Sequence, residues 1–276
     1  MKAVVINGKG GPEVLTVAEI DEPDPGPGDV TVSVAAAAVN PVDIKTRSGF
    51  LPIELTYPAV LGWDVSGTVV AVGPSVTRFA PGDNVIGMIA QPAHRFGTYA
   101  ERVVADESLF AHAPIGISLQ HAAAIPLAAL TAMQLIDKIT LPAHSTVLVT
   151  GAAGAVGGIA SALLSIRGHT VDAVARKSDT ENLLAHGMRR VFMSPVDLPA
   201  GAYDAVVDTA GIVDAIDSVR DGGAYVSIED GNQPEPQRNI TPSKSYVNED
   251  GLGLEKFVSL VSAGTITVPV ARQWEF

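Results

Sequence analysis

The 276-residue sequence contains no cysteine, few aromatic residues and few charged ones. Without cysteine the chain can form no disulfide, has no thiol nucleophile and cannot bind zinc through thiolates. Aromatic residues make up 5% and charged residues 17% of the sequence, whereas hydrophobic residues make up 47%. This composition is typical of a globular protein, and the length suits one large domain or two moderate ones.

Positive charge is also scarce, with 18 lysines and arginines against 30 aspartates and glutamates, a net charge of −12. An acidic chain does not favour contact with a phosphate backbone, so we expect no nucleic-acid partner. We find no apolar run of membrane-spanning length and no secretory signal at the start, so we expect no membrane partner and a cytoplasmic location.

The first 117 residues predict a mostly β domain. Short apolar runs such as KAVVI and VTVSVAAAAV alternate with glycine- and proline-rich turns such as DEPDPGPGDV. No helix longer than about three turns is predicted before residue 118.

From residue 118 onward the pattern changes to helices alternating with buried strands. A helical stretch is interrupted at Pro126, and STVLVTG, HTVDAVAR, YDAVVDTAG and GGAYVSIED then predict strands separated by helices. Such alternation predicts βαβ units and a parallel sheet, so the fold class is α/β. The last segment predicts one more helix and one more strand.

The stretch LVTGAAGAVGG is the strongest single motif. Gly151, Gly154 and Gly157 follow a predicted strand and open a predicted helix. Here the backbone can approach a pyrophosphate, and the helix N-terminus offers free N–H groups. Residues Gly154, Ala155, Val156 and Gly157 are therefore candidates for cradling a dinucleotide, although glycines in such a turn can also serve packing alone.

The end of the second strand distinguishes NADH from NADPH. An NADH site usually has a carboxylate there, whereas this strand ends in Arg176 and Lys177. A guanidinium matches a 2′-phosphate in charge and geometry, so these residues favour NADPH. The competing carboxylate, Asp172, lies inside the strand.

The order of the motifs resembles that of the zinc-free quinone oxidoreductases of the medium-chain dehydrogenase/reductase superfamily. The resemblance rests on VNPVDIKTRSG, LGWDVSGTVVAVGPSVTRFAPGDNVIG, GTYAERVV, AAAIPLAALTAMQ and VLVTGAAGAVGG. It implies a GroES-like catalytic domain over 1–117, completed by 264–276, and a Rossmann dinucleotide-binding domain over 118–263. It also implies a homodimer.

The zinc alcohol dehydrogenases of that superfamily place a cysteine about where Asn40 stands and a histidine about where Trp63 stands. An amide and an indole cannot hold zinc, so we expect no metal. Without a Lewis acid the favoured substrates are electrophiles that accept hydride directly. The resemblance likewise implies an enzyme that reduces quinones or α,β-unsaturated carbonyl compounds with NADPH.

Further site residues follow from this assignment. Asn40 is a candidate for binding the cofactor or a substrate oxygen, and Thr131 matches a family threonine near the nicotinamide. Thr209, Ala210 and Gly211 follow a strand at the edge of the sheet where ligands bind. Tyr57 and Trp63 could line a slot for a flat substrate, and Tyr57 or water could donate the proton. Asn40 and Tyr57 are thus the catalytic candidates.

Two alternatives stay open. An enoyl-thioester reductase would share the fold and the hydride chemistry, and a protein that binds NADPH without turnover would act as a sensor or scaffold. The chain also ends some tens of residues before members of the family usually finish, which leaves open how the first domain is completed.

Overall fold

The computed structural model describes residues 1–228, 231, 233–270 and 272–275 of the chain. By their contacts, the residues divide into two compact units. The first comprises Met1–Leu127 and Asn248–Phe276, and the second comprises Ala128–Val247.

This division differs from the predicted limits because residues 118–127 and helix α6 (Gly251–Ser262) belong to the first unit. Helix α6 packs on strand β8 (Phe110–His112) and on the turn before it. The approach at Gly251 is so close that a Cβ there would lie 2.4 Å from the carbonyl oxygens of Ser108 and Phe110. A side chain at this position would push the helix away, which is why glycine opens it.

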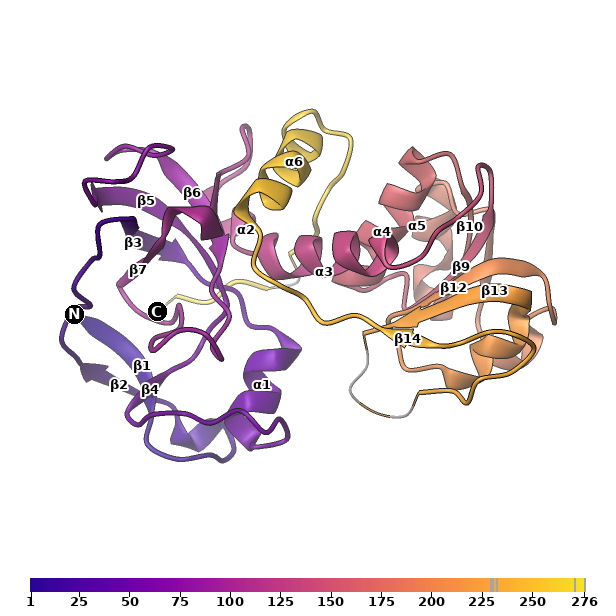
Figure 1. Cartoon of the computed structure of the whole chain (residues 1–276), viewed down its shortest axis with the longest axis horizontal. Coiled ribbons are helices and arrows are strands. Elements are labelled where there is room, and N and C mark those ends of the chain that lie inside the picture. The colour runs from indigo at the N-terminus through magenta and orange to yellow at the C-terminus, as the bar shows by residue number, and fades with distance from the viewer. Residues whose placement is uncertain (229–230, 232, 271, 276) are drawn as a thin grey trace. The chain divides into compact units, whose positions relative to one another are not determined.

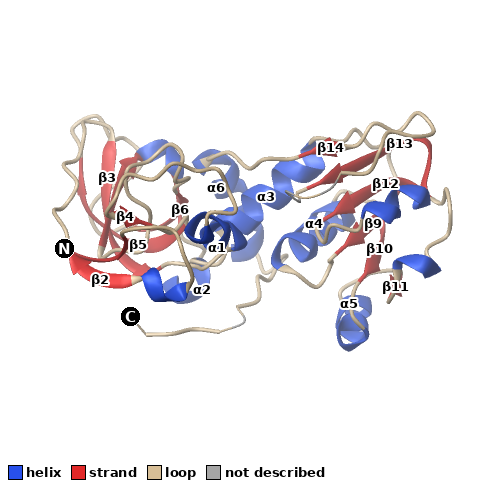
Figure 2. Cartoon of the chain, turned by 90° about the horizontal axis from the view of Figure 1, so that it is seen from below, coloured by secondary structure: helices blue, strands red, loops and turns tan. Residues whose placement is uncertain are grey.

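The first unit is built from two antiparallel sheets, as Figures 1 and 2 show. The smaller sheet has the order β2-β1-β4, and the larger has the order β7-β3-β5-β6-β8. Besides β8, their strands are β1 (Lys2–Ile6), β2 (Thr16–Glu19), β3 (Asp29–Ala36), β4 (Ala59–Val60), β5 (Asp64–Val72), β6 (Asn84–Met88) and β7 (Arg102–Asp106). Short helices α1 (Pro41–Ser48) and α2 (Leu119–Ala122) complete the unit. The predicted mostly β domain is confirmed.

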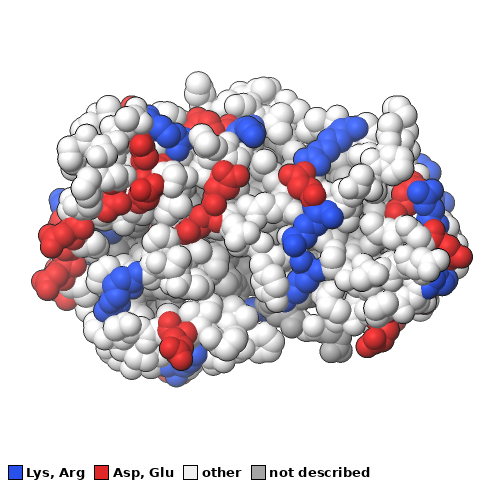
Figure 3. Space-filling model, in the orientation of Figure 1, with Lys and Arg blue, Asp and Glu red and all other residues white. Residues whose placement is uncertain are grey.

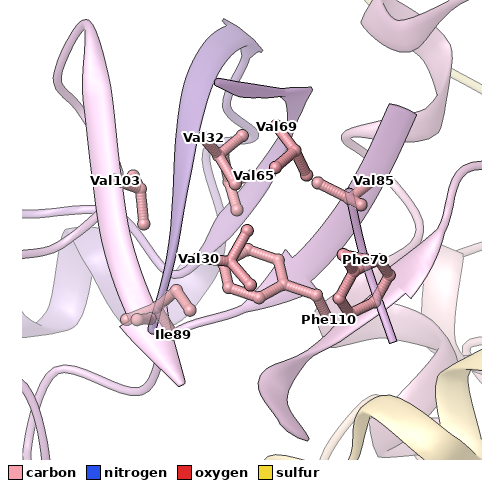
Figure 4. Close-up of a cluster of buried hydrophobic side chains, with 10 residues drawn as sticks. Val30, Val32, Val65, Val69, Phe79, Val85, Ile89, Val103 and Phe110 are labelled. Atoms are coloured by element: carbon pink, nitrogen blue, oxygen red, sulfur yellow. The ribbon is translucent and has the colours of Figure 1, made fainter. Parts of the chain in front are cut away.

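The hydrophobic core on the larger sheet consists mainly of branched aliphatic side chains. Valines 30, 32, 65, 69, 85 and 103 converge on two aromatic rings, as Figure 4 shows. The rings of Phe79 and Phe110 meet edge to face, with their centroids 6.5 Å apart. Alternating inward-facing valines explain why the sequence pattern predicted these strands.

The second unit contains a six-stranded parallel sheet with the order β11-β10-β9-β12-β13-β14, visible in Figure 2. In chain order the strands are β9 (Thr146–Thr150), β10 (Thr170–Val174), β11 (Arg190–Phe192), β12 (Tyr203–Asp208), β13 (Val219–Ser227) and β14 (Ser243–Lys244). The helices are α3 (Pro126–Asp137), which starts at the last residues of the first unit, α4 (Ala155–Ile166) and α5 (Thr180–Ala185). The strand order reverses between β9 and β12, which makes this edge a ligand site in open α/β sheets.

Two predicted elements differ in the structure. The expected helix between β12 and β13 is a 3-10 helix over Val213–Ser218. Its buried residues are Ala215, Ile216 and Ser218, and it ends at once in β13. The expected last strand is not formed in the described residues 264–270 and 272–275.

One stretch corrects the expectation about apolar runs. Leu119–Asp137 is long and apolar enough, by length and composition alone, to cross a membrane. Most of it is buried inside the protein, and Pro126 begins a new helix after the short α2. A buried core helix meets the same criterion, so the stretch is weak support for a membrane segment.

Charged side chains are scattered on the face of the molecule that Figure 3 draws. On the face drawn in Figure 3, acidic and basic side chains lie singly or in small groups, separated by wide uncharged areas.

Candidate functional site

The glycine loop joins β9 to α4 in the way that the sequence predicts. Gly151 has a positive φ of +66°, and Gly154 is the extended N-cap residue of α4. The first helical bond from the loop runs from the N–H of Gly158 to the carbonyl of Gly154 at 2.8 Å. The N–H groups of Ala155, Val156 and Gly157 therefore lie in the first turn, where helix geometry provides no internal acceptor. This turn can bind an anionic group.

Two of the glycines are required by a close approach to the neighbouring loop. A Cβ at Gly157 would lie 2.4 Å from the carbonyl oxygen of Gly151 and 2.8 Å from Thr209 Oγ1. A Cβ at Gly151 would also lie 2.8 Å from Thr209 Oγ1. The loop after β12 therefore closes against the glycine loop at the point where the strand order reverses.

Asp208 organises this second loop, and the sequence analysis did not single it out. It is buried at the end of β12 and accepts hydrogen bonds from the N–H groups of Ala210 and Ile212, both at 3.1 Å. The hydroxyls of Thr150 and Tyr225 also donate to its carboxylate. Four donors on one buried carboxylate fix the path of residues 209–212. A buried aspartate at the carboxyl end of a central strand is the signal that could have found it.

The predicted residues Thr209, Ala210 and Gly211 lie on that loop. Thr209 Oγ1 donates to the carbonyl of Thr150 at 2.7 Å, which ties β12 to β9. Ala210 and Gly211 are exposed, and Gly211 has a positive φ of +72°. Thr209 therefore packs against the glycine loop, whereas Ala210 and Gly211 are exposed to solvent beside it. We call Gly151, Gly157 and Thr209, with the loops that carry them, the cradle.

The predicted phosphate-binding pair follows β10. Arg176 and Lys177 are both exposed, and neither forms an ion pair within the described part of the chain. Arg176 is the N-cap residue of the short turn Lys177–Asp179. Both cations are therefore available to a ligand at the carboxyl edge of the sheet.

The competing carboxylate, Asp172, is already bound by the protein. Arg189 and Arg190 donate to it at distances between 2.7 and 3.0 Å, and the Tyr203 hydroxyl donates at 2.8 Å. Burial alone would raise the pKa of Asp172, but these hydrogen bonds outweigh burial and hold it below its ordinary value. Asp172 is thus a structural anion inside the sheet.

Thr131 lies in α3 and is almost fully buried. Its hydroxyl has no hydrogen-bond partner among the described residues. A buried hydroxyl without a partner is costly and is usually explained by a ligand or a water molecule. This observation fits a threonine that contacts a cofactor.

In the first unit, Asn40 begins helix α1 as its N-cap residue. Its side-chain Nδ2 donates to Asp64 Oδ2 at 2.8 Å, and its backbone N–H donates to Asp43 Oδ2 at 2.7 Å. The N–H of Leu127 donates to the other oxygen of Asp64 at 2.7 Å. Asn40 is thereby held between two buried carboxyl groups.

Both carboxyl groups titrate far from the ordinary range. Burial raises the pKa of Asp64 to about 8, with a further increase from nearby Asp43, against the lowering effect of the Asn40 and Leu127 hydrogen bonds. Burial likewise raises the pKa of Asp43 to about 6, against the hydrogen bond from the Asn40 N–H. Asp64 is therefore mostly a neutral acid at pH 7.

The two aromatic candidates lie in different surroundings. Trp63 is buried, and its indole N–H has no hydrogen-bond partner among the described residues. Tyr57 is 41% exposed in the segment between α1 and β4. Tyr57 is open to a substrate, whereas Trp63 is part of the interior.

The predicted residues therefore form two groups. Asn40 is bonded to Asp64 in the first unit, and the glycine loop meets Thr209 in the second. Among the described residues, no three histidine, aspartate or glutamate side chains gather as a metal site would require.

Comparison with known proteins agrees with this architecture. Residues 26–115 match the model of the alcohol dehydrogenase GroES-like domain. An NADPH-dependent alkenal/one oxidoreductase of Arabidopsis thaliana is 33% identical over 265 residues, which cover 90% of this chain and 67% of that protein.

Two solved structures are similar over nearly the whole chain. A quinone oxidoreductase from Coxiella burnetii has a TM-score of 0.87 at 26% identity, covering 98% of this chain and 90% of that one. A protein described as an NAD-dependent alcohol dehydrogenase has a TM-score of 0.85 at 32% identity, covering 98% and 91%. By contrast, the matches to two other curated relatives cover 60% and 59% of this chain and 53% and 50% of those proteins.

A GroES-like unit together with a second unit built on a parallel sheet of the dinucleotide-binding type defines the medium-chain dehydrogenases and reductases. Within that superfamily the chain belongs to the zinc-free quinone oxidoreductase family. The family and the α/β fold class that the sequence indicated are both confirmed.

Proposed function

We propose that the chain is an NADPH-dependent enzyme that transfers hydride to quinones or α,β-unsaturated carbonyl compounds without a metal ion. The names of two similar proteins support this, because one is an alkenal/one oxidoreductase and the other a quinone oxidoreductase. The observation that carries the proposal is the closed cradle of Gly151, Gly157 and Thr209 at the reversal of the strand order.

The cradle suits a dinucleotide. The free N–H groups of Ala155, Val156 and Gly157 would bind the diphosphate, and the positive end of α4 would stabilise its charge. The buried hydroxyl of Thr131, which has no partner among the described residues, would form a hydrogen bond with the cofactor. Ala210 and Gly211 would line the approach to the reacting ring.

Two features support NADPH over NADH. Arg176 and Lys177 are free to bind a 2′-phosphate. Asp172, the carboxylate that could otherwise bind the ribose hydroxyls, is fully engaged by two arginines and a tyrosine.

Bound NADPH would supply the hydride, and the protein would align and shield the reacting atoms. Conjugation in the acceptor spreads the negative charge that arrives with the hydride, so no Lewis acid is required. Asn40 would hold the acceptor or the cofactor by hydrogen bonds, and Tyr57 would line the acceptor site, whereas Trp63 would act from the interior behind it. Tyr57, or a water molecule, would donate the proton.

The test follows the loss of nicotinamide absorbance with a quinone and with an enone, comparing NADPH with NADH and wild type with Arg176→Ala. We expect turnover with NADPH and a rise in its KM of about tenfold or more in the variant, because a charge-assisted hydrogen bond is lost. The KM for NADH should not change. Equal use of both cofactors and no effect of Arg176→Ala would refute the phosphate assignment.

The alternatives predict different results. Turnover of an enoyl thioester but of no free quinone or enone would favour an enoyl-thioester reductase. Tight NADPH binding without turnover of any acceptor would favour a sensor or scaffold. We also propose a cytoplasmic homodimer, which sedimentation of the purified protein and fractionation of cells would test.

A further inference from the structure

The segment that carries Tyr57 has no regular secondary structure to hold it. Residues 52–56 lie outside helices and strands, and the segment joins α1 to β4. Tyr57 is exposed, so packing alone does not fix its ring. Something else must hold this tyrosine if it is to meet a substrate in one place.

Arg95 bonds to the backbone on both sides of Tyr57. Its Nη1 donates to the carbonyl oxygen of Thr56 at 3.0 Å and to that of Pro58 at 3.1 Å. Its guanidinium carbon also lies over the Phe96 ring, 4.5 Å from the ring centre. One cation thus holds the peptide group just before Tyr57 and the one between Pro58 and Ala59, one residue beyond Tyr57 on the other side.

Arg95 is itself held in a turn with bonds at both ends. His94 Nε2 lies 2.7 Å from Glu249 Oε1, and the N–H of Ala90 donates to the same oxygen at 2.6 Å. On the other side, the N–H of Gly97 donates to the carbonyl of Val60 at 2.9 Å. The turn 90–97 is therefore anchored both to the chain segment at Glu249 and to strand β4.

We propose that Arg95 is a positioning residue that fixes Tyr57 for ring-shaped acceptors, such as quinones and cyclic enones. This inference rests on the proposed function and adds to it a preference within the substrate class. A flat ring gains from a fixed aromatic surface, whereas a short open-chain enone has little area to stack on it. Arg95 acts on the affinity for the acceptor through Tyr57.

The experiment replaces Arg95 by methionine, which keeps a long apolar stem beside Phe96 and removes both hydrogen bonds. We expect the KM for 1,4-naphthoquinone to rise about tenfold, with the KM for methyl vinyl ketone and for NADPH changed less than about twofold. Arg95→Lys should keep most of the affinity, because an ammonium can donate to both carbonyls. A matched control is Arg102→Met, which removes an exposed arginine bound to Glu22 in the same unit. It should change none of the three KM values.

A double-mutant cycle tests whether the effect passes through Tyr57. In a Tyr57→Leu background, Arg95→Met should change the KM for naphthoquinone less than about twofold, because the positioned ring is already absent. The same tenfold effect in both backgrounds would overturn the inference. So would an equal rise in the KM for both acceptors.

Amide hydrogen exchange gives a measurement that needs no turnover. Peptides covering residues 51–60 should exchange faster in Arg95→Met than in wild type and Arg102→Met, with the rest of the chain unchanged. If the wild type reduces no acceptor, the proposed function fails and exchange alone decides whether Arg95 fixes this segment. Unchanged exchange at 51–60 would overturn that role.

Discussion

Replacing Asp64 by asparagine should raise the free energy of unfolding at pH 8 and change it much less at pH 5. An aspartate in the unfolded chain ionises near 3.8, whereas burial raises the pKa of folded Asp64 to about 8. Between these values the folded chain keeps a proton that the unfolded chain has lost. The free energy of unfolding therefore falls as the pH rises through this window, and the loss is complete above the folded pKa.

The size of the effect follows from the same difference. One group that holds a proton only in the folded state lowers the free energy of unfolding by about 1.4 kcal/mol per pH unit. Asparagine does not titrate, and it can satisfy the same neighbours. Its Oδ1 can accept from the N–H of Leu127, and its Nδ2 can face Asn40, whose amide can turn to offer its oxygen. The advantage of Asp64→Asn over wild type should therefore grow by about 3 to 4 kcal/mol from pH 5 to pH 8.

Urea denaturation at pH 5, 6, 7 and 8 measures this difference, with a common m-value as the check that both chains unfold to the same extent. Asp24→Asn, which removes an exposed carboxylate, controls for the loss of one charge. A difference between Asp64→Asn and wild type that stays constant with pH would refute the reasoning. It would mean that Asp64 is ionised in the folded protein over the whole range.

Two further changes test the second unit. Gly157→Ala should weaken NADPH binding about 10- to 100-fold in a fluorescence titration, because its Cβ would lie 2.4 Å from a backbone oxygen. Gly8→Ala, where nothing lies within 4 Å of the added Cβ, should leave binding unchanged, and equal effects would contradict the cradle. Tyr203→Phe removes one donor from Asp172 and should lower the free energy of unfolding by about 1 kcal/mol, measured in urea. The KM for NADPH should stay the same, and a rise would mean that Asp172 belongs to the cofactor site.

The sequence predicted the parts of the fold that depend on local patterns. Apolar periodicity predicted the parallel strands, and Pro126 correctly marked the break before α3. Gly168 and Gly187 have positive φ after their helices, as C-terminal glycines do. The glycine loop was predictable because strand, turn and helix follow one another in the chain.

Features that depend on distant contacts were not predictable in this way. The position of α6 rests on contacts with β8 across about 140 residues of chain, and no local pattern shows them. The engagement of Asp172 needs the pairing of β10 with β11, which brings Arg190 beside it. The four donors on Asp208 come from strands β9 and β13 and from its own loop. The sequence shows that each of these polar residues is present, but the pairing of the strands determines which groups it bonds to.

Under the proposed function, the uncharged surroundings of Asp64 fit conjugated acceptors. In zinc alcohol dehydrogenases, a cysteine and a histidine stand about where Asn40 and Trp63 stand here. A metal at that place would supply positive charge to a carboxylate and to a substrate oxygen. In this chain the groups hydrogen-bonded to the Asp64 carboxyl are an amide and a backbone N–H, neither of them charged. Burial therefore determines the pKa, and the acid stays neutral near pH 7. Under the proposed function, a substrate oxygen beside Asn40 would gain a hydrogen bond from an uncharged amide rather than a bond to a metal ion. The negative charge that arrives with a hydride must then be spread by the acceptor itself, which quinones and conjugated enones can do and saturated ketones cannot.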